Sequence, residues 1–588
     1  MSASASAWGT LFGRLLLLAA SCLPAIGLAT PGWAQSLVAP PPPGSPIPRI
    51  LPPVTPRVAP GLAEPAPSGA AETAGPGTVA VDAVTFEGAT AYPPDKLAQI
   101  AGPLRGPEVA RERIEQARLA LLEQYRRDGA VFTAVNAELS GRRLRFVVTE
   151  GYVAAVEVEG EVGPVRAQVE RFLAHLQGER PLTVAALERW MLLVTDIPGL
   201  TARAVLRPST REPGALTLVA QVSRTVVSGL TLLDNRAYQY TGPTEGLLSV
   251  DVNSLTQWGE RTTFAFFHSF DQTQIFGQAA SEMFLGGSGL KLRVYGGAGN
   301  TIPTGPLSTS GYFGFTTIFG GQLSYPLIRQ RQQTLNLVAA LDASENTVDE
   351  NIGLNGAPAR ASFDSLRVLR AGADYAWLDV WAGETRSATN AASLRVSQGL
   401  PILGASPNGA VDAGRVGERI DFTKASFELS RTQALFAPWP EAMVSLRTAA
   451  AGQYSANVLP PVEKFFLGGS RFNRGYYAGQ VTGDSALTAT AELQLDLPVS
   501  LGSDWPFAPT AQLYAFYDWG QTWESRSTDA NHTLRSTGLG IRLYPTGTPQ
   551  YELDLEGVKR LALYPNGSGP GVSPLRGTAF YWQVLVRF

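Results

Sequence analysis

Cysteine and histidine are almost absent from this 588-residue chain. The one cysteine, Cys22, lies in an N-terminal apolar stretch, so the chain beyond it has no disulfide and no cysteine chemistry. The three histidines, His175, His268 and His532, stand far apart and have no metal-ligand or triad companion at motif spacing. No Gly-rich loop followed by Lys-Ser/Thr is present, so nucleotide energy is not expected. The sequence therefore predicts a protein that is not an enzyme, with no catalytic residues, no metal site and no cofactor.

Charge and long apolar runs are also scarce. Charged residues make up only 16% of the chain and the formal net charge is -3, which gives no electrostatic reason to expect nucleic acid as a partner. After the N-terminal stretch, no segment approaches the roughly 18–20 continuous apolar residues that a spanning helix needs. Mean hydropathy is nevertheless +0.01, so apolar and polar residues must be interleaved, as they are in strands. If the protein is in a membrane, it is there as a barrel.

The first 34 residues have the pattern of a secretory signal peptide. Arg14 precedes an apolar run, and small residues follow it, with cleavage sites offered after Ala29 and after Ala34. A transmembrane anchor is less favoured because the run is short and is broken by Pro24. A lipoprotein site at Cys22 is a poor match, since Ala stands where an aliphatic residue is usual three places earlier.

Residues 35–78 are rich in Pro, Ala and Gly and show no periodicity. Several prolines forbid a continuous helix, so the segment is predicted to be a semi-rigid, largely extended linker. For the same reason it cannot supply a long regular helix.

Two stretches of similar pattern follow, at 79–151 and 152–224. Each is predicted to contain a strand, two helices and two further strands, within the length of a small domain. In the first stretch, Gly129 is placed to end the longer helix. The sequence therefore predicts two α+β modules in tandem. The apolar residues at helical spacing in that longer helix are Ile114, Ala117, Leu121 and Tyr125.

A small sheet covered by two helices leaves a sheet edge and a groove open, and an extended peptide can join such an edge as an extra strand. The alternative is that the modules are only spacers or scaffold. If they bind a partner chain, candidates are the arginines beside the core face of the longer helix, which are expected to be exposed. These are Arg111, Arg118 and Arg126.

From residue 225 to 588 no convincing helix is found, and apolar and polar residues alternate. In 485–497, leucines and alanines fall on one face while Thr488, Glu492 and Gln494 fall on the other. A soluble sandwich would alternate too, but here strands of about ten residues recur, short turns alternate with long Gly/Asn/Pro loops, and aromatics sit at strand ends. About sixteen strand candidates are present, an even number as in bacterial barrels. The predicted fold is a transmembrane antiparallel β-barrel preceded by two α+β modules.

Residues 465–480 combine glycines, aromatics and two arginines, which is typical of a long structured loop rather than of a helix or strand. Arg474-Gly475-Tyr476 lies at its centre. A second stretch, 513–523, carries Asp518 near the end of an alternating strand. An arginine fork and a strand carboxylate can pair across a water-filled space, so Arg474 and Asp518 are predicted partners.

Several motifs, in order, resemble those of two-partner secretion transporters of the ShlB/FhaC/HecB type. The PLT, LER, LL, D-x-PG and PGA-x-x-L elements between 181 and 218 resemble the second POTRA module of that family, and EQYRRDGAVF and VTEGYV resemble its first. NRGY at 473–476 is similar to the family's VRGY/VRGF loop motif, with Asn473 in place of Val. The F-x-D-x-G strand motif is matched by Phe516, Asp518 and Gly520, and Phe588 matches the assembly signal of outer-membrane barrels.

The resemblance implies a 16-stranded barrel in the outer membrane of a Gram-negative bacterium, surrounded by lipid, with both POTRA modules in the periplasm. Its implied function is to export one large secreted partner protein. The loop carrying Arg474 would fold into the lumen and meet Asp518, while Gly475 and Tyr476 let its tip turn and pack on the wall. Phe588 would address the chain to the barrel-assembly machinery, with periplasmic chaperones as further partners in biogenesis.

Two other functions stay open at this point. A barrel-assembly factor of the BamA/TamA type would insert other barrels, although such proteins usually carry three or more POTRA modules. A porin for small solutes is the other alternative, although a porin has no use for a peptide-binding arm.

Overall fold

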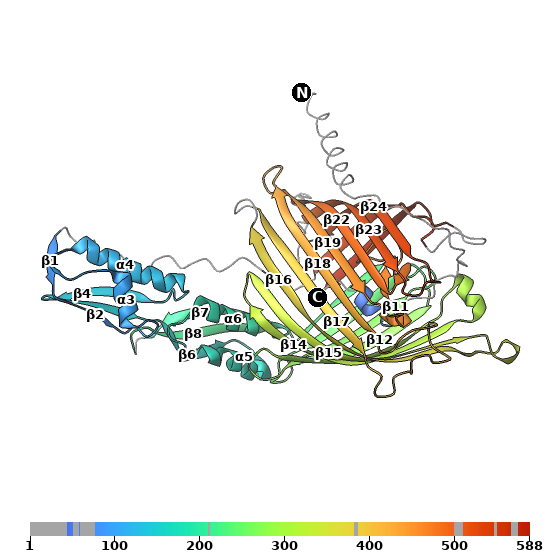
Figure 1. Cartoon of the computed structure of the whole chain (residues 1–588), viewed down its shortest axis with the longest axis horizontal. Helices are drawn as coiled ribbons and strands as arrows, with labels where there is room; N and C mark the ends of the chain where they lie inside the picture. The colour runs from blue at the N-terminus through green and yellow to red at the C-terminus, as the bar shows by residue number, and fades with distance from the viewer. Residues whose placement is uncertain are drawn as a thin grey trace, which may run out of the picture.

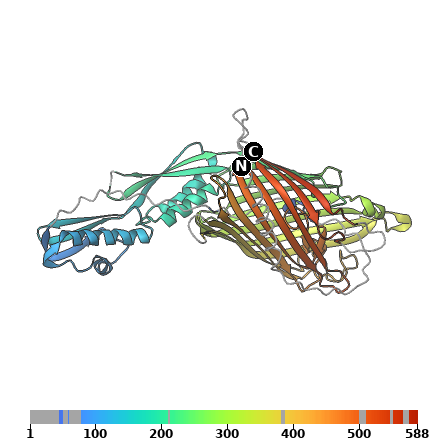
Figure 2. The same ribbon diagram turned by 90° about the horizontal axis from the view of Figure 1, so that it is seen from above.

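The computed structural model describes residues 44–50, 58, 77–209, 212–380, 386–498, 510–545, 550–565 and 574–588. Two small modules stand in a row beside one end of a barrel (Figures 1 and 2). We call this end of the barrel the near end and the opposite one the far end. Among the described residues, no helix is long and apolar enough to cross a membrane. The predicted signal peptide, 1–34, lies outside the described residues.

The first module packs two helices on two small sheets, β2-β5-β4 and β1-β3. All four residues predicted to face the core from the longer helix, α4, are buried, which confirms the helical spacing. The strand β3 was not predicted, because it begins with Gly-Pro, a pair that disfavours strands. The elements are β1 (Thr78–Val81), β2 (Ala83–Glu87), α3 (Pro94–Ala101), β3 (Gly106–Ala110), α4 (Arg111–Arg127), β4 (Ala134–Ser140) and β5 (Arg143–Thr149).

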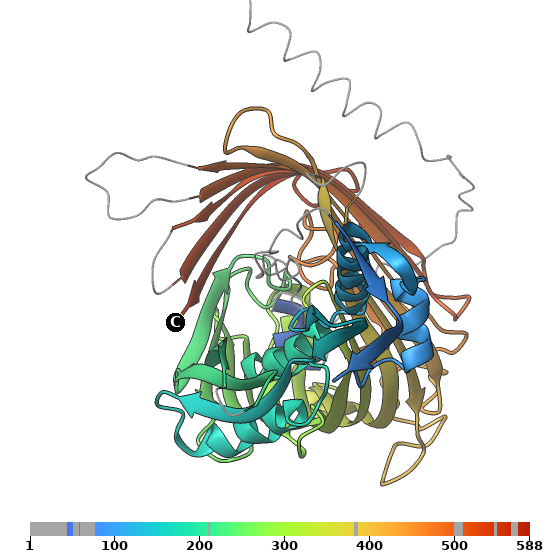
Figure 3. The ribbon, with the colours of Figure 1, turned by 90° about the vertical axis from the view of Figure 1, so that its left-hand side faces the viewer.

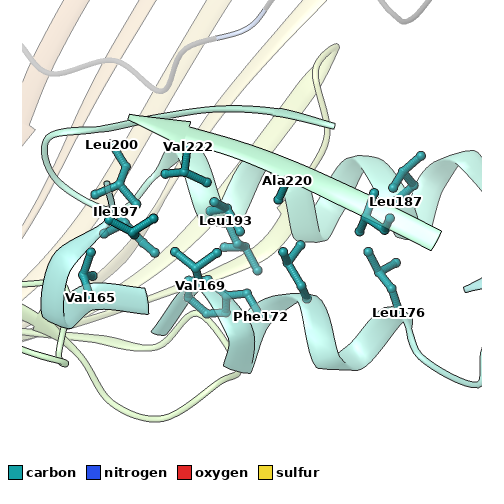
Figure 4. Packing of buried hydrophobic residues seen from close by; sticks show 14 of the residues in the cluster. Val165, Val169, Phe172, Leu176, Leu187, Leu193, Ile197, Leu200, Ala220 and Val222 are labelled. Atoms are coloured by element: carbon teal, nitrogen blue, oxygen red, sulfur yellow. The ribbon is translucent and has the colours of Figure 1, made fainter. Parts of the chain in front are cut away.

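The second module has one sheet, β6-β8-β7, covered by two helices. Figure 4 shows its core, in which Val169 and Phe172 of one helix meet Leu193 of the other beneath Val222 of the sheet. Thr183 caps the second helix by accepting a hydrogen bond from the Ala186 amide. The elements are β6 (Tyr152–Glu159), η1 (Gly163–Val165), α5 (Arg166–Leu173), η2 (Ala174–Leu176), α6 (Val184–Thr195), β7 (Leu200–Pro208) and β8 (Ala215–Arg224).

The second module is docked on the near end of the barrel. Phe284, at the end of a barrel strand, belongs to the module's own hydrophobic core and is 1% exposed. Arg329 forms two hydrogen bonds of 2.7 Å with Asp196 at the end of α6. Arg189 donates to the carbonyl oxygen of Pro326 at 3.1 Å. Shared core packing and a bidentate ion pair together fix the module relative to the barrel mouth.

The barrel is closed and has sixteen antiparallel strands, which confirms the predicted fold. The last strand pairs with the first from Gln583↔Asp234 to Arg587↔Leu230. The strands are β9 (Val227–Asp234), β10 (Glu245–Asn253), β11 (Arg261–Ser269), β12 (Gln274–Phe284), β13 (Lys291–Thr301), β14 (Phe313–Arg329), β15 (Gln333–Glu350), β16 (Ala359–Val380), β17 (Ser387–Gly399), β18 (Thr423–Phe436), β19 (Met443–Tyr454), β22 (Ser485–Pro498), β23 (Thr510–Trp523), β24 (His532–Tyr544), β25 (Gln550–Arg560) and β26 (Thr578–Arg587).

The strands alternate between an apolar outer face and a polar lumen face. In β22, Leu487 is exposed on the outside, whereas Thr488, Glu492 and Gln494 are buried inside. Burial of Glu492 therefore results from polar groups that fill the lumen, not from a hydrophobic core.

Residues 455–484 join β19 to β22 and are here called the lumen loop. They contain the short hairpin β20 (Phe465–Leu467) and β21 (Val481–Gly483), together with η5 (Pro461–Glu463). Two other far-end connections contain the short helices η3 (Gly305–Ser310) and η4 (Leu354–Gly356).

Part of the predicted linker lies inside the barrel. A four-residue helix, α2 (Ile47–Ile50), is visible as the short blue segment within the barrel (Figures 1 and 3). Ile47 and Ile50 are each 4% exposed and pack against Leu232, Leu247 and Phe267 of the wall. The prediction of an extended linker is thus wrong for residues 47–50. Pro48 falls in the first turn, where a helix tolerates proline, and the two isoleucines bury against an apolar patch of the wall.

Candidate functional site in the barrel lumen

The lumen loop turns tightly at two glycines that follow β20. Gly468 and Gly469 have φ angles of 103° and 100°, a region that side chains rarely adopt. A Cβ on Gly468 would overlap the carbonyl oxygen of Tyr477. The Gly469 amide donates to the carbonyl oxygen of Tyr476 at 2.9 Å. The predicted structured loop is therefore held by its own backbone, and its tip is residues 473–476.

Arg474 lies at the tip and is clamped by two carboxylates of the wall. Its amide donates to Asp518 Oδ2 at 2.8 Å, and its guanidinium reaches Asp518 Oδ1 at 3.0 Å. The same guanidinium pairs with Glu492 and donates to Thr490 Oγ1 at 2.9 Å. Arg474 is 6% exposed and Asp518 only 1%. A cation this deeply buried is stable only because two carboxylates compensate its lost hydration.

The F-x-D-x-G motif of β23 forms the surface on which this tip rests. Phe516 lies beneath Arg474, with the guanidinium carbon 3.7 Å from the ring centroid, as in a cation–π contact. Its ring is close over Gly538, where a Cβ would be 2.6 Å away. A Cβ on Gly520 would overlap the side-chain oxygen of Asn473. Because side chains on a strand alternate, positions 516, 518 and 520 all face the lumen and serve as support, counter-charge and free space.

Gly475 and Tyr476 pack against neighbouring strands. A Cβ on Gly475 would lie 2.5 Å from the Cβ of Ser536, so only glycine fits without a shift of the wall. Tyr476 is fully buried, and its hydroxyl donates to the carbonyl oxygen of Arg535 at 2.8 Å and accepts from the Ala562 amide at 3.1 Å. The tyrosine thus inserts its ring between strand ends and satisfies its hydroxyl there.

The carbonyl groups of the tip are also bound. Arg236, just after β9, donates to the Arg474 carbonyl oxygen at 2.9 Å and pairs with Glu556 at 2.7 Å. Arg560 Nε and the Tyr581 hydroxyl both donate to the Gly475 carbonyl oxygen. The tip is therefore held by the segment just after β9 and by the last two strands, as well as by β22 and β23.

Sequence reasoning did not single out these further contacts. A signal was present for some of them, because Glu492, Glu556 and Tyr581 occupy lumen-facing positions of clearly alternating strands. It was not decisive, since any barrel strand carries polar lumen residues. The residues missed are Arg236, Thr490, Glu492, Glu556, Arg560 and Tyr581.

Comparison with protein families settles what kind of protein carries this lumen. The model of the haemolysin secretion/activation protein family ShlB/FhaC/HecB matches residues 215–543. The chain belongs to the ShlB/FhaC/HecB family. Residues 79–151 also match the POTRA domain of ShlB type. Members of this family are two-partner secretion transporters, not enzymes.

Individual ShlB/FhaC/HecB relatives are distant in sequence. The chain is 21% identical, over 77% of its length and 79% of the relative's, to the heme/hemopexin transporter protein HuxB of Haemophilus influenzae (strain 86-028NP). The structure of CdiB from Escherichia coli superimposes with a TM-score of 0.69 at 19% identity, covering 90% of this chain and 94% of that one. CdiB from Acinetobacter baumannii has a TM-score of 0.60 at 14% identity, covering 87% and 90%. At these identities the solved structures show the shared fold alone.

In this ShlB/FhaC/HecB member, the three module arginines differ in environment. Arg111 is exposed at the start of α4, but Arg118 and Arg126 are half-buried, so the prediction that all three are exposed is wrong. Arg118 donates to Glu115 at 2.6 and 2.8 Å and to the Val135 carbonyl oxygen at 3.2 Å. Val135 belongs to β4, the edge strand beside α4, and a strand edge offers carbonyl groups to a nearby guanidinium. Arg118 is thus bound to the edge strand β4 instead of lying free.

Phe588 closes the seam of the barrel. Its amide donates to the Gly229 carbonyl oxygen at 3.0 Å, and its carbonyl oxygen accepts from the Gly229 amide at 2.8 Å. Its side chain is 47% exposed on the outer face.

The charged residues of the site position the lumen loop. Within the described ranges, no group of three or more His, Cys, Asp or Glu side chains is arranged to hold a metal ion. His175 stacks on Trp190, with ring centroids 3.9 Å apart, and His268 lies beside Phe266. The lumen cluster consists of arginine forks on carboxylates, which positions a loop and can be released without breaking covalent bonds.

Proposed function

We propose that this chain is the outer-membrane pore of a two-partner secretion pair and exports one large haemolysin- or adhesin-like protein from the periplasm to the cell surface. The observation that carries the proposal is the Arg474 tip, held inside a closed barrel by reversible ion pairs with Asp518 and Glu492. A static plug could be built from apolar packing alone. A loop held by buried charges can be released when other charges or water replace its ion-pair partners.

Capture of the partner takes place at the modules. In the first module β4 is an edge strand beside α4, and in the second β7 is an edge strand beside α6. An unfolded chain can add to either edge through main-chain hydrogen bonds, which read little sequence. Because the second module is docked on the near end, a captured segment is delivered at the mouth of the lumen.

Passage then requires the lumen to clear. Both the lumen loop and residues 47–50 occupy it, and they line one common cavity of about 240 Å³ with Arg236 and Tyr238. Space of that volume holds a few side chains, not a folded domain. At rest the lumen therefore has no room for a passing chain, so both segments move aside as the exported chain, still unfolded, enters.

In the proposed mechanism, export uses no nucleotide. The chain has no phosphate-binding loop, so the free energy comes from the partner, which folds outside and cannot return. The neighbouring gene is expected to encode a very large secreted protein rich in β-helix repeats.

The test is co-expression of this chain with that neighbouring gene in cells lacking both. Partner protein should reach the cell surface with wild-type chain and fail to do so with Arg474→Ala, at equal amounts of barrel in the outer membrane. A matched control is Arg142→Ala, which removes an exposed ion pair with Asp82 in the first module. Surface delivery without this chain, or undiminished delivery by Arg474→Ala, would refute the proposal. Flux of small solutes without partner export would assign a porin instead.

A further inference from the structure

A second buried ion cluster lies at the far end of the barrel, away from the Arg474 tip. Residues 400–422, here called the strap, join β17 to β18 and fold inward. Ile420 and Phe422 of the strap are buried against Leu366 and Val368 of β16 and against Leu459 of the lumen loop. Leu366 and Val368 alternate with the outward-facing Leu369, which is 46% exposed. The strap therefore packs on the lumen side of the wall at the far end.

One arginine of the strap joins three separate connections. Arg415 donates from one nitrogen to Asp484 at 2.6 Å and from another to Glu524 and Asp529, both at 2.7 Å. Asp484 is the last residue of the lumen loop, and Glu524 and Asp529 belong to the connection between β23 and β24. These partners are 69, 109 and 114 residues away in sequence. Arg415 is only 10% exposed, so it is the centre of a largely desolvated cluster.

The cluster depends on this cation. Asp484 is fully buried, and besides Arg415 its carboxylate accepts only backbone amides, from Leu459 at 2.9 Å and Ser525 at 2.8 Å, among the bonds of the described residues. Lys464 pairs directly with Glu524 at 2.7 Å and interacts with Asp484 only through its charge at longer range. Without Arg415, Asp484 would be a buried carboxylate with no direct ion-pair partner among the described residues, a costly arrangement that the loops would relieve by moving apart.

The strap is fastened to the wall next to this arginine. The Gly414 amide donates to Asp364 Oδ1 of β16 at 2.9 Å, and a Cβ on Gly414 would overlap the same carboxylate. Ser406 and Ser365 exchange two hydrogen bonds of 2.8 and 2.9 Å. One side of the strap is thus tied to β16, while Arg415 extends from it to the connections around β22, β23 and β24.

We propose that the strap is an outer gate and that Arg415 is its latch: the ion cluster keeps the far-end mouth closed at rest and opens when an exported chain reaches it. This rests on the proposed function, since a gate needs something to pass. Its ion cluster is separate from the Arg474 anchor, because the two clusters share no residue although both hold the lumen loop. Arg415 is a positioning residue, which acts by holding three far-end segments together.

The gate is tested without any partner protein, by single-channel recording of the purified full-length chain in planar lipid bilayers. Arg415→Ala should raise the fraction of time spent in conducting states about tenfold or more, because a buried ion cluster has lost its cation. Arg415→Lys keeps a charge but not the fork, and is expected to restore part of the closure. The matched control is Arg419→Ala, in the same strap, whose arginine is half-exposed and pairs only with its neighbour Asp421 among the ion pairs of the described residues.

Glu524→Gln weakens the cluster by removing the charge of one of the carboxylates that bind Arg415. It replaces Arg415→Ala in the test if that variant does not assemble, as judged by heat-modifiable migration on a gel. It should also raise the open fraction. Conductance of Arg415→Ala and Glu524→Gln indistinguishable from that of wild type and Arg419→Ala would overturn the gate, whatever the export assay shows. Wild-type chain that exports nothing, yet opens on loss of Arg415, would refute the proposed function and leave the gate standing.

Discussion

Gly520 and Asn473 are in such close contact that a Cβ on the glycine would overlap the Asn473 side-chain oxygen. Asn473 has a φ of 56°, and its oxygen accepts a hydrogen bond from Thr488 at 3.1 Å. Asparagine is one of the few residues that tolerate a positive φ. Its side-chain amide also helps to hold the loop tip against the barrel wall. Because it has no side chain, Gly520 of the strand motif leaves room for Asn473, the first residue of the loop motif.

Gly520→Ala should displace the loop tip without unfolding the barrel. The added methyl group meets Asn473, so the tip shifts and Arg474 loses its alignment with Asp518. Partner export is expected to fall severalfold while heat-modifiable migration is retained. Gly557→Ala in β25 is the control, because a Cβ there meets nothing within 4 Å. Equal export by both variants would show that the contact is not needed.

Arg474→Ala and Asp518→Ala should impair export together and not additively. Arg474→Ala leaves Asp518 buried without its cation, and Asp518→Ala leaves Arg474 with Glu492 as its one carboxylate, each a loss on the order of 3–5 kcal/mol, whereas the double change removes both charges of the pair. A double-mutant cycle on export rate and on thermal stability measures the coupling. The exposed pair Arg142–Asp82, with side chains 62% and 59% exposed, provides the comparison cycle and should show about 1 kcal/mol or less. Additive defects for Arg474 and Asp518 would contradict the predicted pair.

Phe588 is expected to act through its ring in assembly and through its backbone in seam closure. Phe588→Ala keeps both main-chain bonds to Gly229, so it should lower the amount of barrel in the outer membrane while the assembled protein keeps its thermal stability and export activity. Deletion of Phe588 removes those bonds too and should lower stability as well. Quantitative membrane fractionation and melting on gels separate the two effects. Normal assembly of Phe588→Ala would reject the signal role.

Glu150 should make the first module sensitive to acid. Burial opposes its ionisation, but hydrogen bonds from Thr90, Ala91 and Tyr125 outweigh burial and hold the pKa of this carboxyl below its ordinary value of 4.5. A lowered pKa contributes stability that is fully present above the ordinary value and is lost as the pH falls through the folded-state value. Acid should therefore loosen this module below about pH 4.5, while the barrel stays intact.

Glu150→Gln tests that assignment. At pH 7 it should destabilise the module by about 1–3 kcal/mol, and the difference from wild type should shrink as the pH falls below 4.5, because protonation of Glu150 removes the same advantage. Calorimetry of the full chain follows the module's own transition. Glu123→Gln, on the exposed face of α4, is the control and should leave that transition unchanged. A difference independent of pH would show that the charge of Glu150 is not involved.

Local patterns in the sequence determined most of the architecture. Helical spacing placed Ile114, Leu121 and Tyr125 in a core, and alternation assigned Leu487 to the outside and Glu492 to the lumen. Both follow from the side-chain periods of a helix and a strand, 3.6 and 2 residues, which can be seen in the local sequence without knowledge of tertiary contacts. The Arg474–Asp518 pair was within reach for the same reason, since the strand period points Asp518 into the lumen and the family motif supplies the arginine.

Only the tertiary structure decided which distant groups meet. Closure of the barrel brings Arg236, just after the first strand, and Arg560, at the end of the last strand but one, to the same loop tip. Inward folding of the strap brings Arg415 to Asp484. The helix at residues 47–50 also exists only against the lumen wall, because four residues cannot sustain a helix alone. Such contacts join segments tens to hundreds of residues apart, and their energies depend on desolvation inside the closed lumen, which no local pattern encodes.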